Sequence, residues 1–234
     1  SRERYEHFGK IGRAGAFARL AKHGNPGTAE GRRKGGLNSL KTHRQKATGF
    51  TLAKDHRRPA KSSELAEFLG ILIGDGHLSK YQFEISTNSE TDLDHAKFIM
   101  RLGQDLFGLK VSLKKRKREK AVSVKASSVN LVKWLNNLGM PIGNKLSHNL
   151  SIPDWVLTNR NWQKSFIRGL FDTDGCLYLD THKIKGKIYK NIGWTLTSYS
   201  AKLRQDIVEL LINLGFKPTL RSTQKSVYLR RKND

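Results

Sequence analysis

Residues 65–76 read LAEFLGILIGDG, and a related stretch, SFIRGLFDTDG, occupies residues 165–175. Each stretch is apolar, carries regularly spaced small residues and ends in Asp-Gly, which predicts a buried helix followed by a turn. Ser62 or Ser63 can cap the first helix, and Glu64 lies in its first turn. The recurrence of this helix indicates that the chain contains two related halves.

The elements that follow each helix also repeat. A strand hairpin, a helix and a second hairpin are predicted in each half, at 77–86 and 176–197, at 90–107 and 201–214, and at 109–126 and 217–230. The first half adds a helix at 129–138. The second half is expected to lack its last helix, which would begin near Asp234.

The residues before Ser62 have a different composition. They are rich in Gly, Lys and Arg, hold few large aliphatic residues and show no clear period. They are interpreted either as a disordered basic tail or as an arm that follows DNA phosphates and orders on binding. In the second case residues 15–22 and 29–46 would form helices. The predicted organisation is an extension over 1–61, a first half with its linker over 62–160 and a second half over 161–234.

The charge balance narrows the class of partner. The chain has 44 Lys and Arg against 20 Asp and Glu, a net charge of +24. This surplus favours nucleic acid ahead of an acidic membrane surface, although a ribosomal or histone-like scaffold would be as basic. The single cysteine, Cys176, excludes an intramolecular disulfide and a Cys-rich zinc site. No signal peptide and no membrane-spanning apolar run is found, so an intracellular protein of unspecified compartment is expected.

The small residues of each motif helix fall on one stripe. They recur at every fourth position, as Ala66, Gly70 and Gly74 in one helix and as Ser165, Gly169 and Thr173 in the other. Glycine inside a helix costs about 1 kcal/mol relative to alanine, so a close helix contact is the expected reason for it. We predict that the two helices face each other and bring Asp75 and Asp174 together.

Two carboxylates at one place repel each other unless a cation lies between them. Oxygen ligands suit Mg²⁺, or another divalent cation such as Mn²⁺, and such an ion can assist phosphodiester hydrolysis. The alternative is that each Asp-Gly pair only ends its helix and starts a turn. Two matching pairs in a very basic chain favour the metal site.

Residues 68–76 and 167–175 resemble the two signature motifs of a single-chain LAGLIDADG homing endonuclease, and the resemblance extends over 62–234. It implies an α+β fold of two pseudo-symmetric αββαββ halves packed through their motif helices, with curved antiparallel sheets forming a DNA-binding saddle. It also implies that Asp75 and Asp174 are catalytic and hold the metal, assisted by the carbonyl groups of Gly74 and Thr173.

The resemblance implies two further groups at the site. Lys145, in the loop after the first half's last helix, would polarise the attacking water or stabilise charge on the phosphate; a solvated loop lysine is the alternative. Glu84, on the second strand of the first half, would lie near the metal-bound water, with Thr195 as its counterpart. An outward-facing strand residue is the alternative for both.

Basic and polar residues of the hairpins are predicted to contact double-stranded DNA. A two-stranded ribbon can enter the major groove, and most cationic contacts would go to phosphates. The predicted contact residues are Tyr81, Gln82, Lys114, Lys115, Arg116, Lys117, Arg118, Lys183, Lys185, Lys187, Arg221, Lys225 and Arg230.

The sequence therefore predicts a monomeric, Mg²⁺-dependent homing endonuclease that makes a staggered double-strand cut in a long DNA target. Two alternatives stay open: a non-catalytic DNA-binding regulator on the same scaffold, and an RNA maturase that assists splicing of an intron RNA. Regulators of this kind tend to lose the motif acids, whereas this chain keeps both.

Overall fold

The chain divides into two compact units, Ser1–Leu52 and Ala53–Asp234. The computed structural model describes residues 2–23, 27–46, 53–116, 119–220 and 225–230. The first unit holds helices α1 (Arg2–His23) and α2 (Ala29–Gln45), so the helices expected over 15–22 and 29–46 are both present. Thr28 caps α2 by accepting a hydrogen bond from the Gly31 amide at 3.1 Å. In the part of the chain that the structure describes, no helix has the length and apolarity needed to cross a membrane.

The division between the units falls earlier than the predicted boundary at residue 61. The amide of Arg57 donates to the Phe107 carbonyl oxygen at 2.7 Å, and the Ser128 hydroxyl donates to the Lys54 carbonyl oxygen at 2.9 Å. The His56 ring lies tilted against the Trp134 ring, with 5.9 Å between the ring centres. Residues 53–61 are therefore part of the second unit and pack on its first half.

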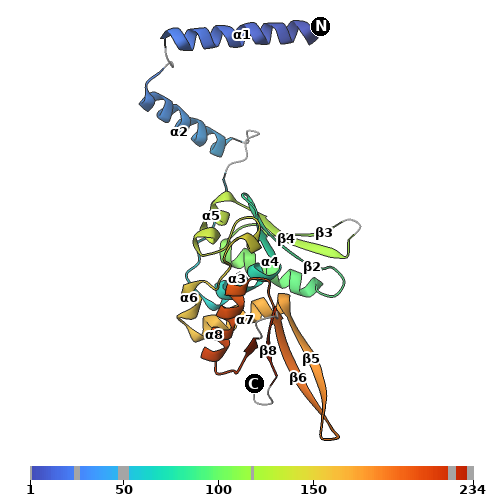
Figure 1. Cartoon of the computed structure of the whole chain (residues 1–234). Coiled ribbons are helices and arrows are strands. Elements are labelled where there is room, and N and C mark those ends of the chain that lie inside the picture. Colours follow the sequence, from blue (N-terminus) through green and yellow to red (C-terminus); the bar gives the residue numbers. More distant parts are fainter. Residues whose placement is uncertain (1, 24–26, 47–52, 117–118, 221–224, 231–234) are drawn as a thin grey trace. The chain divides into compact units, whose positions relative to one another are not determined.

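The second unit contains two αββαββ halves, as predicted (Figure 1). The first half comprises α3 (Ser63–Gly74), β1 (Gly76–Leu78), β2 (Gln82–Asn88), α4 (Leu93–Phe107), β3 (Ser112–Lys115) and β4 (Ala121–Ser127), followed by α5 (Val129–Asn137). The second half comprises α7 (Arg160–Asp174), β5 (Gly175–Ile184), β6 (Lys187–Thr197), α8 (Ala201–Asn213), β7 (Thr219–Leu220) and β8 (Ser226–Leu229). The linker between them carries the 3₁₀ turn η1 (Lys145–Ser147) and α6 (Asp154–Leu157).

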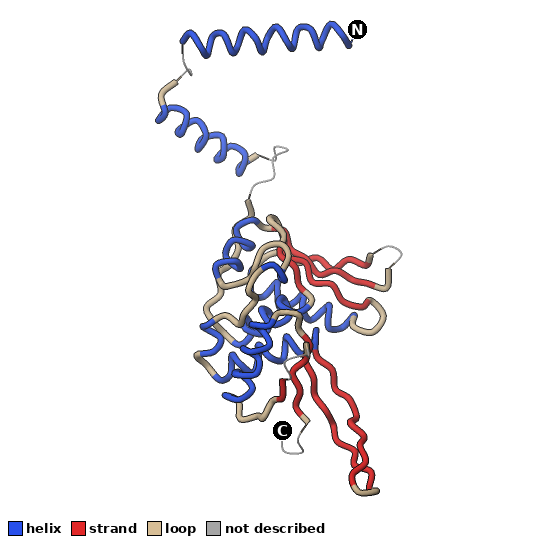
Figure 2. The backbone as a smooth tube through the Cα atoms, in the orientation of Figure 1, coloured by secondary structure: helices blue, strands red, loops and turns tan. Residues whose placement is uncertain are grey.

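Each half builds one antiparallel sheet of the same topology, β1-β2-β4-β3 and β5-β6-β8-β7. Alternation along the strands gives each sheet an apolar and a polar face. In β2, Phe83 and Ile85 are buried while Gln82, Glu84 and Ser86 are only partly covered. Helices α4 and α8 pack on their sheets, and both sheets diverge from the motif helices on the same side (Figure 2).

The motif helices α3 and α7 pack almost backbone to backbone, as the small-residue stripes predict. A Cβ atom added to Gly70 would lie 2.2 Å from the Phe166 carbonyl oxygen. A Cβ atom added to Gly169 would lie 2.2 Å from the Glu67 carbonyl oxygen. Only glycine leaves room for this contact, which therefore fixes how the two halves meet.

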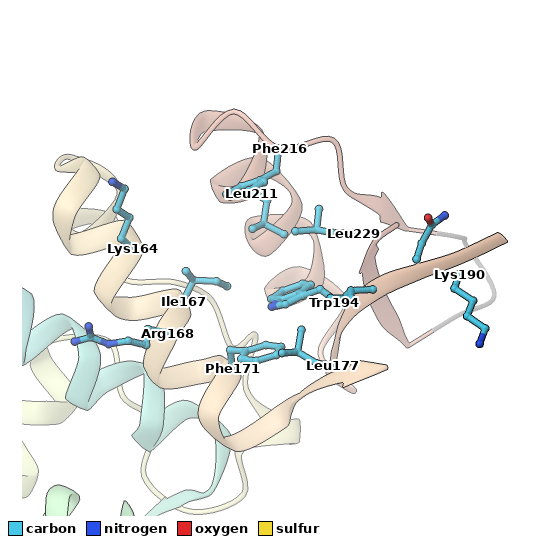
Figure 3. Close-up of a pocket in the computed structure, with 12 residues that line it drawn as sticks. Lys164, Ile167, Arg168, Phe171, Leu177, Lys190, Trp194, Leu211, Phe216 and Leu229 are labelled. Atoms are coloured by element: carbon cyan, nitrogen blue, oxygen red, sulfur yellow. The ribbon is translucent and has the colours of Figure 1, made fainter. Parts of the chain in front are cut away.

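The halves differ in how their sheets are covered. In the first half α5 lies against β2 and buries Leu131, Val132 and Leu135. The described part of the second half has no helix after β8. There a hollow of about 650 Å³ is lined mainly by apolar side chains, including Phe171 of α7, Trp194 of β6 and Phe216 in the loop after α8 (Figure 3). Leu177 and Ile192 at its edge are 63% and 75% exposed, so an apolar face of this sheet is open to solvent.

Candidate metal centre and nucleic-acid interface

The two motif aspartates meet where the paired helices end. Asp75 is the C-cap of α3, and its amide donates to the Ile71 carbonyl oxygen at 3.1 Å. Asp174 is the last residue of α7. A Cβ atom added to Gly74 would lie 1.9 Å from Thr173 Oγ1 and 3.3 Å from Asp174 Oδ2. The backbone before one aspartate thus touches the other aspartate, so the structure brings Asp75, Asp174, Gly74 and Thr173 together.

The carboxyl groups at this junction resist ionisation. Burial and the neighbouring Asp174 raise the pKa of Asp75 to about 6, with Lys145 and His95 acting in the opposite direction. Burial also raises the pKa of Asp174, and Lys145 opposes that rise. These shifts are typical of carboxylates that share one place without enough positive charge.

Lys145 reaches the same junction from the linker. Its Nζ donates to the Ile73 carbonyl oxygen at 2.6 Å and to the Gly74 carbonyl oxygen. The loop that carries it is held to the first sheet, because the Gly143 amide donates to the Leu78 carbonyl oxygen at 2.8 Å. Burial lowers the pKa of Lys145, while Asp174 and Asp75 oppose this effect. Lys145 is therefore a positioned cation and not a freely solvated loop lysine.

A cavity of about 490 Å³, lined by both polar and apolar residues, opens at the junction. Asp174, Lys145 and Gly74 line it, together with groups contributed by both halves that include His77, Ser198 and Tyr199. None of the residues around the apolar hollow in Figure 3 belongs to this set. The cavity at the junction is therefore the candidate site, and the apolar hollow is separate from it.

Glu84 makes contacts that the sequence did not indicate. Its carboxylate accepts a hydrogen bond from Arg116 Nη2 at 3.0 Å, on the polar face of the first sheet. Hydrogen bonds from Ser123 and Arg116 lower the pKa of Glu84, although burial opposes them. Its counterpart Thr195 has a buried hydroxyl without a hydrogen-bond partner among the described residues. The predicted role of Glu84 near an active-site water stays a prediction.

Some of the residues predicted to contact DNA lie on the polar face of their sheet, and others lie on the apolar face. In β3, Lys114 pairs with Ser123 and lies on the polar face, whereas Lys115 pairs with the buried Val122. In the second hairpin, Lys183 pairs with Ile188 and shares a face with the exposed Leu177 and Leu179. The polar faces carry Gln82, Lys114, Arg116, Lys187 and, just after β8, Arg230.

The remaining predicted contacts lie at the ends of strands or outside the described chain. Tyr81 is 67% exposed in the turn before β2, and Lys185 has a positive φ of 49° in the β5–β6 turn. Lys225 precedes β8 and places its Nζ 4.1 Å from the centre of the Tyr199 ring. Lys117, Arg118 and Arg221 lie outside the described residues.

Several residues that line the cavity at the junction were not predicted from the sequence. His77 follows the first Asp-Gly directly, and Tyr199 follows β6, so proximity along the chain to a motif or strand end was the available signal. It also missed His95 on α4, whose charge opposes the raised pKa of both Asp75 and Asp172. No periodicity distinguishes these residues from ordinary surface residues.

Comparison with known proteins agrees with the geometry. Residues 161–233 match the family model of the LAGLIDADG-like domain. Among curated relatives, tRNA-splicing ligase RtcB of Methanopyrus kandleri is 28% identical over 185 residues, covering 68% of this chain and 18% of the relative. Replication factor C small subunit of Methanocaldococcus jannaschii is 27% identical, covering 68% of this chain and 8% of the relative. The chain thus spans less than a fifth of the length of these relatives.

Solved structures of similar fold include I-DmoI in complex with DNA and Mn, at 20% identity and a TM-score of 0.48, covering 72% of this chain and 88% of that chain. The meganuclease I-SmaMI bound to uncleaveable DNA has 14% identity and a TM-score of 0.45, covering 73% of this chain and 79% of that chain. Residues 161–233 therefore form a LAGLIDADG-like domain, and the first half repeats the same order of motif helix, strands and helix.

Proposed function

We propose that this protein is a homing endonuclease that cuts both strands of a long DNA target by metal-dependent hydrolysis of phosphodiester bonds. The observation that carries the proposal is the meeting of Asp75, Asp174 and Lys145 at the junction of the two halves. One polar sheet face extends from each side of that junction. A duplex bound by both faces would present its two strands to one central pair of acids.

The donor set at the junction fits a hard divalent cation. Two carboxylates lie close enough for one to raise the pKa of the other, and the neighbouring Lys145 and His95 offset this rise only in part. Mg²⁺ and Mn²⁺ accept one or two carboxylates and complete their coordination with water and phosphate oxygens. When bound, such an ion would lower the pKa of a water molecule and neutralise charge on the scissile phosphate.

The side chains of the protein then have separate tasks. Asp75 and Asp174 would hold the cation, one from each half, so that loss of either half removes the site. Lys145 is fixed by two backbone carbonyl groups, and its charge would offset the negative charge that develops on the phosphate. Glu84 would serve through Arg116, by holding a cation on the face that binds DNA.

The curated relatives support a mobile element. The matching segment occurs in proteins named as an RNA ligase, a replication factor and, in Pyrococcus abyssi, a subunit of an A-type ATP synthase. It accounts for 18%, 8% and 11% of these proteins. Because their named activities have nothing in common, a segment inserted into different genes is the simplest explanation, and a site-specific DNA cut is the chemistry that such spreading needs.

The test is a selection for binding and cleavage on a randomised duplex library with Mg²⁺. Wild type should be compared with Asp75→Asn, Asp174→Asn and the matched control Asp105→Asn, which alters an exposed aspartate of α4. Wild type and the control should cut one long site, and the two motif variants should bind it without cutting. Binding without cutting by wild type would indicate a regulator, and binding of intron RNA without a DNA cut would indicate a maturase.

A further inference from the structure

A row of three residues crosses the polar face of the second sheet. Tyr178 on β5 lies directly opposite Gly193 on β6. Trp194 pairs with Leu229 on β8, so the next position opposite Gly193 is Arg230. Tyr228 lies on the same face, one row away, opposite Thr195. The row therefore reads tyrosine, glycine, arginine, and Tyr178 is the third residue after the end of the second motif.

The glycine in the middle lets the outer two residues touch. A Cβ atom added to Gly193 would lie 2.4 Å from Tyr178 Cζ, so the tyrosine ring lies directly over the glycine backbone. The ring thus leans across β6, and its hydroxyl accepts a hydrogen bond from Arg230 Nε at 3.0 Å. The guanidinium carbon of Arg230 is also 4.1 Å from the centre of the Tyr228 ring.

These contacts orient the guanidinium group of Arg230 but do not occupy its Nη1 and Nη2 atoms. Tyr178 accepts from Nε and the Tyr228 ring lies against one flat face of the group, so neither contact uses the Nη1 and Nη2 donors. Among the described residues, Arg230 has no carboxylate partner. A planar pair of donors held in this way matches the O6 and N7 acceptors that guanine presents in the major groove.

The first half offers an internal contrast. Arg116 is also on a polar sheet face, but Glu84 accepts from its Nη2 at 3.0 Å and Glu119 from its Nη1 at 3.4 Å. Ser123 accepts from its Nε at 3.0 Å. All three guanidinium nitrogens of Arg116 thus donate to groups of the protein itself. Within the described part of the chain, only Nε of Arg230 does so, and Nη1 and Nη2 can donate to an acceptor on a bound molecule.

We propose that Arg230 is a specificity-determining residue that reads a guanine in the half of the DNA target bound by the second sheet, with Tyr178 and Tyr228 as its positioning residues. This inference rests on the proposed function, because it requires a DNA duplex on the polar face. Arg230 would thus recognise a base, whereas most of the other basic side chains would contact phosphates.

The experiment uses the duplex recovered for wild type, with each base pair replaced in turn, and measures binding of the full chain. Arg230→Gln should abolish discrimination at one guanine, by about tenfold or more, and leave the other positions unchanged. Tyr178→Phe keeps the charge and the ring but removes the acceptor, and it should weaken discrimination at the same guanine only. Because that change deletes one hydroxyl, it tests the inference even where Arg230→Gln lowers the melting temperature.

Lys225→Gln is the matched control, since it removes one positive charge next to a tyrosine ring of the same half. It should weaken binding to every sequence equally and reduce the salt slope by about one. An equal loss for all sequences with Arg230→Gln would show a phosphate contact and overturn the inference while leaving the endonuclease in place. Failure of wild type to bind any duplex would overturn both.

Discussion

Single glycines set the distance between the two halves. Gly70 and Gly169 each face a carbonyl oxygen of the opposite motif helix, and a Cβ atom at either would lie 2.2 Å from that oxygen. The obstacle in both cases is backbone, which cannot rotate away as a flexible side chain can. This contact also sets where the carboxylates at the helix ends lie, so the size of the residues on the stripe determines the geometry of the candidate site.

Replacing Gly70 by alanine is therefore expected to lower the free energy of unfolding of the second unit by about 3 kcal/mol, the upper range for overpacking a tight contact. Denaturant unfolding followed by tryptophan fluorescence measures it. Gly35→Ala is the control, because nothing lies within 4 Å of a Cβ atom at that helical glycine. A Gly70→Ala protein that unfolds at the wild-type midpoint would contradict the close packing of α3 and α7.

The raised pKa of Asp75 predicts a pH dependence of stability for the metal-free protein. The folded chain holds this proton up to about pH 6, whereas the unfolded chain releases it near the ordinary value of 3.8. The stabilising contribution is thus complete below the unfolded value and is lost as pH rises through 6. Partial burial of the carboxyl group raises its pKa, but the residue as a whole still has contact with solvent, so screening should reduce the effect to about 1 kcal/mol.

Denaturant unfolding in EDTA at pH 4.5 and 7.5 measures this effect. Wild type should lose more stability than Asp75→Asn over that interval, and Asp105→Asn should follow wild type. Added Mg²⁺ at pH 7.5 should stabilise wild type but not Asp75→Asn, since only a folded site that binds the ion is stabilised. Parallel pH profiles for wild type and Asp75→Asn would show that the carboxylates do not share a site.

Among the elements, the linker has a role beyond connection. The Ile152 amide donates to the buried carboxylate of Asp206 on α8 at 3.0 Å, and Lys202 Nζ contacts the other carboxylate oxygen. The Ser200 hydroxyl, at the start of the same helix, donates to the Leu150 carbonyl oxygen at 3.0 Å. The linker that carries Lys145 is thereby fastened to the second half.

Asp206→Ala should cost about 2–3 kcal/mol of folding free energy, because it leaves the buried Ile152 amide without its acceptor. Glu209→Ala, an exposed change on the same helix, should stay within about 0.5 kcal/mol of wild type. Thermal unfolding compares the two variants. Since the same linker positions Lys145, Asp206→Ala should also slow cutting more than it weakens binding; equal stability of both variants would rule out the linker contact.

The sequence predicts those elements whose residues carry a repeated or periodic pattern. The motif helices, the helix order and the contact through Gly70 and Gly169 follow from spacing alone, and the structure confirms them. Strand register does not follow, because each hairpin sets it through its turn. This is why Lys115 and Lys183 were grouped with Lys114 and Lys187 although their partners place them on opposite faces.

Contacts between residues far apart in the chain could not be predicted from the sequence either. The pairing of Glu84 with Arg116 and of Tyr178 with Arg230 joins residues that lie 32 and 52 positions apart. Neither partner indicates the other in the sequence. The helices before residue 47 were predicted only as a possible result of DNA binding, because their Gly-rich composition has low helix propensity and their apolar residues follow no stripe.

At the level of the whole molecule, the two units differ in what they contain. The acids of the candidate site lie in the second unit, at the contact of its two halves. The first unit, residues 1–52, holds twelve of the Lys and Arg residues and three of the acidic ones, which is +9 of the total +24. Its large apolar side chains Phe8, Ile11 and Phe17 are all exposed, so it contributes charge and not core.

Removal of residues 1–52 is therefore expected to weaken DNA binding without changing which sequence is preferred. Each phosphate contact that is lost lowers the slope of log affinity against log salt by about 0.9, because fewer counterions are released. Binding titrations at several salt concentrations, on the selected duplex and on an unrelated one, measure both effects. The shortened protein should keep its melting temperature, since the core lies entirely in the second unit.

A full-length variant with Lys41, Arg44 and Lys46 changed to Gln should lower the slope part of the way and show that charge, not chain length, is responsible. An unchanged slope in the shortened protein would mean that the first unit does not touch DNA, and the second unit would then have to supply all of the electrostatic attraction.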